Sequence, residues 1–249
     1  MEYNEFLEKM RGIKKRGFIP SIRKGPTGIG KTLEELLGIE ENNIQGPDFS
    51  KYELKATRKG SSSMVTLFTK KLEPDSGEKL WEVYGYSNGS ATDRDYKQTT
   101  LFKSQKRAVF VPPEERELHN TVCANTPNSQ GMKLVIDDNK VVIANPKKVP
   151  CYYSKPILKE TMEKKYAILL HVLAEHKIEN GKEYFWYNEV CRYSGLRFET
   201  FMNLIKEGKM KVDIRIGHYP NGKVHDHGTG LRIMPTYLPE CFDNRKRIL

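Results

Sequence analysis

The sequence lacks the features that mark secreted, membrane-spanning and zinc-ribbon proteins. Its four cysteines stand far apart with no CxxC pair, which excludes a zinc ribbon and a closely spaced disulfide framework. No apolar run approaches the roughly 20 residues that span a bilayer, because the best one, 166–174, is short and contains a histidine. No apolar signal region or internal repeat is present. We therefore expect a cytoplasmic protein with reduced cysteines and no membrane partner.

Basic residues outnumber acidic ones, with 42 Lys and Arg against 32 Asp and Glu, so the formal net charge is +10 at pH 7. The charges are spread along the chain, which places the basic surface on the folded body rather than on a tail. Such a surface favours a polyanionic partner such as nucleic acid. The 249 residues can bury a core of their own, and we predict one domain, 1–249.

Local patterns predict a mixture of helices and hairpins. Apolar residues at helical spacing predict helices at 3–13, 32–38, where Thr32 and Glu35 form a capping-box pattern, and 198–207. Alternating patterns predict paired strands at 52–57 with 64–69, within 133–144, within 168–187 around Asn180-Gly181, and at 211–216 with 231–234. A further strand is expected at 108–111. This mixture indicates an α/β fold.

The segment GPTGIGKT, residues 25–32, matches the phosphate-binding pattern GxxxxGK[ST]. A phosphate-binding loop follows a buried apolar strand, but the preceding segment, GFIPSIRK, contains Pro20 and ends in Arg23 and Lys24. No later run of four apolar residues ends in an aspartate that could hold magnesium. We therefore interpret the segment as a basic turn that leads into a helix, and expect no nucleotide cofactor.

The segment PDFSKYELK, which ends at Lys55, offers the chemistry of a phosphodiester hydrolase. Such an enzyme needs clustered carboxylates to hold Mg²⁺ at the scissile phosphate and a cation near the attacking water. Residues two apart in a strand share a face, so Glu53 and Lys55 point together, while Tyr52 and Leu54 face the core. Asp48, just upstream, can supply a second carboxylate. We predict that Asp48 and Glu53 hold the metal ion.

An acid two residues before a lysine is by itself a weak pattern. Its other occurrences are Asp95/Lys97, Asp138/Lys140, Glu163/Lys165, Glu175/Lys177 and Glu207/Lys209. These pairs fall in turns, in or beside helices, at the end of a strand, or in an unassigned polar stretch. Glu53 and Lys55 combine a strand with an upstream acid that follows a proline, although a solvated strand face explains the same residues.

Near the C-terminus, KVDIRIGHY alternates apolar and polar residues, so Asp213 and Arg215 share a polar face. The expected partner strand, GLRIM, carries Arg232 outward, and the joining loop contains HDHG. Arginine and histidine on such a ribbon can read guanine edges in the major groove, and an aspartate can accept from a cytosine amino group. Two alternatives stay open. The HDH segment could bind a metal ion with His218 or Cys241 as a third ligand, or the hairpin could be an ordinary polar one.

Several segments together resemble the MvaI/BcnI restriction endonucleases, which are relatives of the mismatch-repair nickase MutH. The resemblance is closer to the MvaI side and rests on RKGPTGIGKTLEELL, PDFSKYELKATR, SMVTLFTKK, HKIENGKEYFWYNEV and KMKVDIRIGHYPNGKVHDHGTGLRIM, while about 72–160 matches poorly. It implies a MutH-like PD-(D/E)XK nuclease core, a mixed sheet flanked by helices, with a two-lobed DNA-binding cleft. The implied lobes are catalytic at 1–115 and DNA-recognising at 155–249. It also implies a monomer that binds double-stranded DNA and needs Mg²⁺.

The resemblance also implies roles for single residues. Asp48, Glu53 and Lys55 carry over as the active site, with Glu34 on the preceding helix as an accessory acid. The residues implied to read the C:G pairs of a five-base CCNGG-like site are Asp213, Arg215, His225, His227 and Arg232. Further expected DNA contacts are Thr69, Lys70, Tyr219 and Asp226. Thr69 replaces a histidine of BcnI-type members and Tyr219 matches MvaI-type members, so both favour CC(A/T)GG.

The leading interpretation is thus a type II restriction endonuclease. A MutH-like repair nickase would keep the same active site but require an activating partner and a GATC-type target. A DNA-binding protein without catalysis is a third alternative, and the intact set of Asp48, Glu53 and Lys55 weighs against it.

Overall fold

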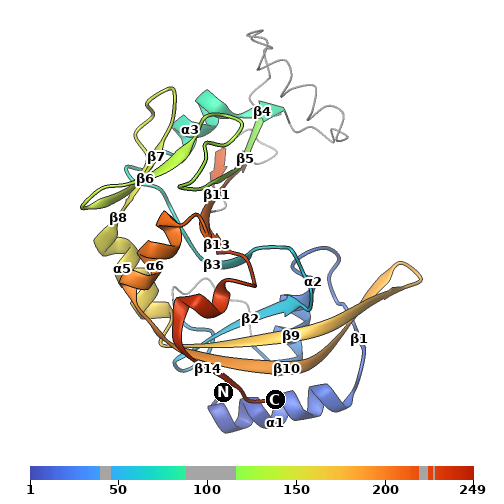
Figure 1. Cartoon of the computed structure of the whole chain (residues 1–249). Helices are drawn as coiled ribbons and strands as arrows, with labels where there is room; N and C mark the ends of the chain where they lie inside the picture. Colours follow the sequence, from blue (N-terminus) through green and yellow to red (C-terminus); the bar gives the residue numbers. More distant parts are fainter. Residues whose placement is uncertain (40–45, 88–115, 219–223, 227) are drawn as a thin grey trace. The chain divides into compact units, whose positions relative to one another are not determined.

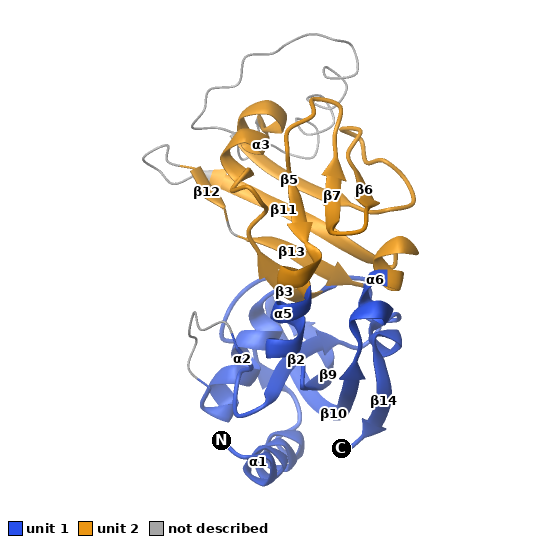
Figure 2. Cartoon of the chain, turned by 90° about the vertical axis from the view of Figure 1, so that its left-hand side faces the viewer, with its two compact units in different colours: residues 1–65, 159–202, 234–249 blue, residues 66–158, 203–233 orange. Residues whose placement is uncertain are grey.

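The structure is a computed structural model. It describes residues 1–39, 46–87, 116–218, 224–226 and 228–249, so the strand expected at 108–111 lies outside the described residues. The chain divides into two compact units (Figure 2), of which unit 1 holds 1–65, 159–202 and 234–249, and unit 2 holds 66–158 and 203–233. Each unit is thus assembled from separate stretches, whereas the expected lobes were consecutive. The single endonuclease domain with those lobes stays a prediction.

Within the described residues, unit 1 is built on a mixed five-stranded sheet (Figure 1). The strands are β1 (Ile19–Pro20), β10 (Lys182–Leu196), β9 (Ile168–Glu179) and β2 (Tyr52–Arg58), in that order, with β14 (Phe242–Arg247) also paired to β10. Strands β9 and β10 form the hairpin predicted around Asn180-Gly181, which is confirmed. Strand β2 runs parallel to β9.

One face of this sheet carries the core of unit 1. Tyr52 and Leu54 of β2 pack with alternate residues of β9 and β10 against the helices α1 (Tyr3–Lys15) and α2 (Gly28–Leu37). The helix predicted at 3–13 is therefore confirmed. Glu53 lies on the opposite face of β2, away from this apolar core.

Helix α2 begins at Gly28 rather than at the predicted Thr32, and its N-cap is Thr27. A Cβ at Gly28 would lie 2.6 Å from Oγ of Ser21, so only a glycine lets the helix start this close to the preceding segment. Thr32 lies inside the helix, where its buried hydroxyl accepts a 3.1 Å hydrogen bond from the backbone N–H of Ile22. The predicted capping box at Thr32 is therefore wrong.

The predicted hairpin between 52–57 and 64–69 is also wrong. Strand β2 takes β9 as its parallel partner, with Tyr52 beside Ile168 and Arg58 beside Ala174. Strand β3 (Val65–Lys70) instead pairs with β13 of unit 2. The apolar run of β9 is buried on both faces at its start, as expected of a strand with parallel pairing, and it outcompetes the local partner.

Unit 2 contains a six-stranded sheet and a three-stranded sheet among its described residues. The larger sheet is ordered β3, β13 (Thr229–Ile233), β11 (Met210–His218), β5 (Arg116–Val122) and β4 (Tyr86–Ser87), with β12 (Val224–Asp226) also paired to β11. The smaller one is ordered β6 (Lys133–Ile136), β7 (Lys140–Ala144) and β8 (Tyr152–Ser154). The hairpin predicted within 133–144 and the pairing of 211–216 with 231–234 are confirmed.

Short helices complete the described parts of the fold. They are α3 (Gly77–Tyr84), α5 (Lys155–Lys165), α6 (Phe198–Lys206) and the 3-10 helix η2 (Leu238–Cys241). Helix α6 confirms the helix predicted at 198–207. Every helix among the described residues is too short or too polar to span a lipid bilayer.

Candidate active site

A tight turn brings Asp48 beside strand β2. Phe49 and Tyr52 exchange two backbone hydrogen bonds, of 3.2 and 2.8 Å, across a turn that contains Ser50. The backbone of Ser50 is left-handed, with φ at 48°, and the rings of Phe49 and Tyr52 stack with centroids 5.4 Å apart. The turn therefore folds back on the strand, and Oδ2 of Asp48 accepts a 2.6 Å hydrogen bond from the backbone N–H of Leu54.

Glu53 and Lys55 share the face of β2 that points away from the helices α1 and α2. The side chain of Glu53 is fully buried, although glutamate is among the residues least often found inside proteins. Nζ of Lys55 lies 2.5 Å from Oε1 of Glu53. The two-residue spacing thus produces the predicted contact between an acid and a cation.

A second lysine completes this cluster, and the motif analysis missed it. Lys165 ends helix α5, and its Nζ lies 3.2 Å from the same oxygen of Glu53, Oε1. The sequence contains a signal for it, because Lys165 comes just before β9, the strand that runs parallel beside β2. Its own acid and lysine pattern with Glu163 lies in a helix, where residues two apart do not face each other.

Burial controls the electrostatics of this cluster. Burial raises the pKa of Glu53 above its usual range, and the Asp48 carboxylate adds to the rise, while Lys55 and Lys165 lower it. Tyr166 is buried next to the same acids. Burial raises the pKa of its hydroxyl, and Glu53 and Asp48 raise it further, so Tyr166 stays protonated. The two lysines therefore offset part of the rise that burial causes in the pKa of Glu53.

One carboxylate oxygen of Glu53 is suited to a metal ion. Both lysines contact Oε1, whereas Oε2 is buried and has no hydrogen-bond partner among the described residues. A buried, unpaired carboxylate oxygen is costly unless a cation or donor satisfies it. The Asp48 carboxylate lies close enough to Glu53 to raise its pKa. The oxygen donors of Asp48 and Glu53 fit Mg²⁺.

Glu34 is not gathered with these two acids. It lies on α2 with about a third of its side chain exposed, and its Oε2 is 4.0 Å from Nζ of Lys31 on the same helix. Among the described residues, no three acidic, histidine or cysteine side chains come close enough together to hold a metal ion. The role of Glu34 as an accessory acid stays a prediction.

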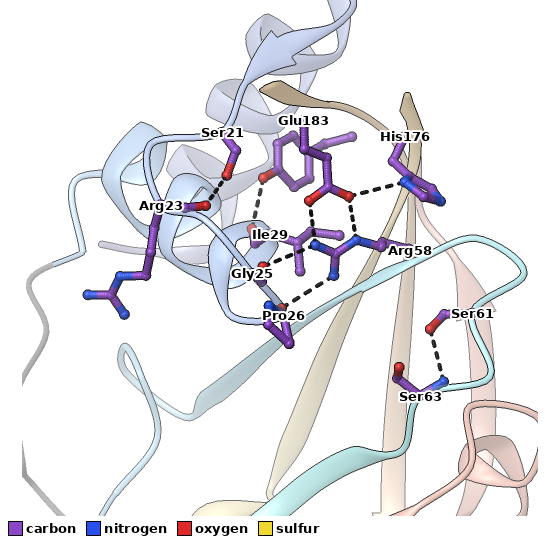
Figure 3. A network of polar contacts seen from close by, with 11 residues as sticks. Ser21, Arg23, Gly25, Pro26, Ile29, Arg58, Ser61, Ser63, His176 and Glu183 are labelled. Carbon is purple, nitrogen blue, oxygen red and sulfur yellow. Dashed lines mark hydrogen bonds and ion pairs between the residues drawn. The ribbon is translucent and has the colours of Figure 1, made fainter. Parts of the chain in front are cut away.

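The far end of β2 is anchored by Arg58 (Figure 3). Its guanidinium forms a two-pronged ion pair with Glu183 on β10, at 2.6 and 2.7 Å, and lies 5.2 Å from the ring centroid of Phe185. It also donates to the carbonyl oxygens of Gly25 and Pro26 at 3.3 Å. Arg58 therefore ties the GPTGIGKT segment to the strand that carries Glu53 and Lys55.

Several predicted DNA-contacting residues lie on the polar face of the large sheet of unit 2. Nη1 of Arg232 donates a 2.6 Å hydrogen bond to Oδ2 of Asp213. The hydroxyl of Thr121, on β5, donates a 2.9 Å bond to Oδ1 of the same carboxylate. Arg215 donates a long 3.4 Å bond to the carbonyl of Gly228, and its buried Nε has no hydrogen-bond partner among the described residues.

Strand β5 adds residues to this face that no motif identified. His119 lies directly opposite Arg215, with 48% of its side chain exposed. The hydroxyl of Tyr86 holds the backbone of His119 in place. It donates a hydrogen bond to the carbonyl of His119 and accepts one from the N–H of His119. No short motif contains these residues, so the pairing of β5 with β11 reveals them.

The HDHG loop is partly described. Oδ1 of Asp226 accepts a 2.8 Å hydrogen bond from the backbone N–H of Gly228, so Asp226 shapes the turn. A Cβ at Gly228 would lie 3.0 Å from Thr69, which places Thr69 beside the loop. His225 is half-buried on β12, and Lys70 is half-buried at the end of β3. The predicted contacts Tyr219 and His227 lie outside the described residues. For the alternative metal site at HDH, the described residues contain no group of three possible ligands.

Beside strand β2, β9 buries a histidine, and we expect its titration to make the stability of unit 1 depend on pH. Nε2 of His171 lies 2.7 Å from the hydroxyl of Thr57, and the ring is 3% exposed. Burial lowers the pKa of His171 to about 4, with Arg245 adding to the fall and Glu189 opposing it. The unfolded chain, with an ordinary pKa near 6.5, therefore binds this proton more readily than the folded chain.

We expect the stability contributed by neutral His171 to be fully present above about pH 6.5 and lost as the pH falls towards 4, by on the order of 3 kcal/mol. Urea unfolding at pH 7.5 and pH 4.5 measures this loss. The His171→Gln variant should lose less stability between the two pH values than the parent chain. His119→Gln, at an exposed position, is the matched control, and an equal loss in the parent and His171→Gln would contradict the assignment.

The family model of the MvaI/BcnI restriction endonuclease family matches residues 7–242. Among solved structures, a complex of the restriction endonuclease MvaI with its cognate DNA substrate is 30% identical, with a TM-score of 0.81 over the full length of both chains. The restriction endonuclease MvaI in the absence of DNA is 29% identical, with a TM-score of 0.53, again over both full lengths. No curated protein matches the chain.

These findings confirm two predictions made from the sequence. The α/β fold with mixed sheets flanked by helices agrees with the MvaI structure, and a PD-(D/E)XK core is consistent with it. The resemblance stated from the motifs agrees with a match that extends over nearly the whole chain. The chain belongs to the MvaI/BcnI restriction endonuclease family.

Proposed function

We propose that this restriction endonuclease is a type II enzyme that hydrolyses both strands of double-stranded DNA at a short CCNGG-like site, with CC(A/T)GG favoured, and that it depends on Mg²⁺. The proposal rests on the burial and the contacts of the Glu53 carboxylate. Its carboxylate is buried, holds two lysines on one oxygen, and keeps the other oxygen without a described partner. That arrangement fits a cation-dependent hydrolase better than a protein that only binds DNA.

Asp48 and Glu53 would hold the metal ion. When bound there, Mg²⁺ supplies Lewis-acid polarisation of the scissile phosphate and lowers the pKa of a water molecule. The chain contributes a rigid frame for the two acids, because the backbone N–H of Leu54 fixes Oδ2 of Asp48 and the sheet fixes Glu53. A fixed frame lets the acids meet the octahedral geometry that Mg²⁺ demands.

Lys55 and Lys165 have distinct duties in this scheme. Both ammonium groups stabilise the ionised form of buried Glu53, which is the form that binds a cation. Lys55 is on the same strand face as Glu53, with about a quarter of its side chain exposed, so it can position or activate the attacking water. Lys165 approaches Glu53 from helix α5. Its proposed role is to hold the Glu53 carboxylate in place.

The polar face of the large sheet in unit 2 would read the DNA bases. Arg215 carries a buried Nε with no described partner, and guanine N7 and O6 are the acceptors that arginine pairs with in the major groove. Arg232 and Asp213 extend the same face. We propose that this face reads the C:G pairs of the site. An odd central base pair makes a perfectly twofold dimer awkward, which supports a monomer.

The proposed reaction is tested by digesting DNA of known sequence with the purified protein. We expect both strands to be cut in Mg²⁺ and neither in EDTA, because Asp48 and Glu53 offer only oxygen ligands for a cation. Sequencing the fragment ends should place every cut at CC(A/T)GG.

Other outcomes separate the alternatives. Nicks that need an added partner protein would favour a repair nickase. Tight binding to DNA with no cleavage under any divalent metal would favour a DNA-binding protein. Cuts at sites unrelated to CCNGG would overturn the proposed target while leaving the nuclease activity in place.

Replacing the strand lysine tests its role near the reacting water. We expect Lys55→Ala to lower single-turnover cleavage by about 1000-fold or more, since it removes a cation next to the buried acid. Binding to a CCAGG duplex, measured by fluorescence anisotropy in Ca²⁺, should change less than about threefold. Lys51→Ala, at an exposed position of the preceding turn, is the control. Unchanged cutting by Lys55→Ala would sink the assignment.

The second lysine predicts a further effect. Lys165→Ala should lower cleavage by roughly 10- to 100-fold, because buried Glu53 loses one of its two compensating charges. Lys165→Arg keeps the charge and should recover most of the activity. Lys164→Ala changes the exposed neighbour on the same helix and should cut like the parent enzyme. Equal activity of the Lys165→Ala and Lys164→Ala variants would show that Lys165 has no part in the site.

A further inference from the structure

We propose that Thr121, on strand β5, is a positioning residue that sets sequence specificity by fixing Asp213 and, through it, Arg232. This inference rests on the proposed function, because it assumes that the polar face of unit 2 reads the DNA bases. It assigns a part in recognition to a strand that no sequence motif identifies.

Thr121 is the cross-strand neighbour of Asp213 in the antiparallel pair of β5 and β11. Its hydroxyl donates a 2.9 Å hydrogen bond to Oδ1 of Asp213, while Nη1 of Arg232 donates a 2.6 Å bond to Oδ2. Both oxygens of this carboxylate are therefore engaged by protein donors. Asp213 is also 8% exposed, so it is a mostly buried acid held between two strands.

The hydrogen bonds from Arg232 and Thr121 constrain the Asp213 carboxylate in different ways. The ion pair alone would let the carboxylate turn about its Cβ–Cγ bond and carry the arginine with it. A second donor on Oδ1 removes that freedom, because the carboxylate plane must then satisfy both partners. On the other flank, Gly230 lies opposite Asp213 and has no side chain with which to hold it. Thr121 is therefore the paired residue that fixes the orientation of Asp213.

The orientation of Asp213 matters because of what it holds. Bidentate recognition of guanine requires that two N–H groups of one guanidinium point at O6 and N7 in a fixed plane. An ion pair with a fixed carboxylate pre-sets such a plane before DNA arrives, so less rotational freedom is lost on binding. On this proposal Asp213 acts through Arg232. Thr121 acts through Asp213.

The test separates the hydroxyl from the shape of the side chain. Thr121→Val keeps the size but lacks the donor, whereas Thr121→Ser keeps the donor. Single-turnover cleavage and anisotropy binding in Ca²⁺ are measured on a CCAGG duplex and on duplexes with one C:G pair replaced. We expect Thr121→Val to lower the preference for CCAGG about tenfold at one of the C:G pairs. Thr121→Ser should stay within about twofold of the parent.

Thr126→Val makes the same change in an exposed loop of unit 2 and should leave the preference unchanged. An unaltered preference in Thr121→Val, or an equal loss in Thr121→Ser, overturns the proposal. So does an equal fall on all duplexes with a lowered unfolding midpoint, which is the mark of a merely structural role. A parent protein that prefers CCAGG in binding but never cuts would sink the proposed catalysis alone. A parent with no preference in binding would sink both.

Discussion

The proposed active site depends on two lysines that favour the ionised form of the buried Glu53 carboxylate. Moving a carboxylate out of water is so costly that an unassisted acid would take up a proton. Here two ammonium groups, of Lys55 and Lys165, contact the same oxygen and oppose the effect of burial. The fold of unit 1 brings both lysines to Oε1 of Glu53.

Strand β2 alone could not build this cluster. Its neighbour β9 must run parallel, so that the end of helix α5 arrives beside Glu53 and delivers Lys165. The turn that precedes β2 must fold back to place Asp48 on the backbone of Leu54. At the other end of the strand, Arg58 and Glu183 tie β2 to β10. Each contact constrains the strand at a different place, so the register of Glu53 and Lys55 is over-determined.

Local chemistry explains what the sequence could predict. The hairpin at Asn180-Gly181 needs φ values above zero, which those two residues adopt at 50° and 73°, so its signal is contained in a few neighbouring positions. The alternation of Glu53 and Lys55 with core residues is equally local. The false hairpin between β2 and β3 shows the limit, because two suitable strands joined by a turn need not pair when a more apolar partner such as β9 is available. Lys165 and Thr121 act across pairings that join distant parts of the chain, and no short motif contains such information.

The segment GPTGIGKT matches a phosphate-binding pattern, but its described contacts are structural. In a phosphate-binding loop the backbone N–H groups face the ligand and the threonine hydroxyl faces the metal ion. Here the carbonyl oxygens of Gly25 and Pro26 face Arg58, and the hydroxyl of Thr32 is buried against the N–H of Ile22. The threonine hydroxyl that a nucleotide-bound metal ion would need is therefore committed to the fold. Gly28 serves close packing at the start of α2, because a Cβ there would clash with the preceding segment.

Glu53 and Asp213, the two buried acids among the residues that the structure describes, contrast in a way that bears on function. In Glu53 both cations crowd one oxygen, so the other oxygen is left for a ligand that the chain does not itself provide. In Asp213 a donor engages each oxygen, so the carboxylate is satisfied before any ligand arrives. The first arrangement is costly until a cation binds, whereas the second is stable on its own and gives its neighbour a fixed direction. The distribution of donors over the two oxygens thus supports the two proposed roles, in which Glu53 binds a metal ion and Asp213 orients an arginine.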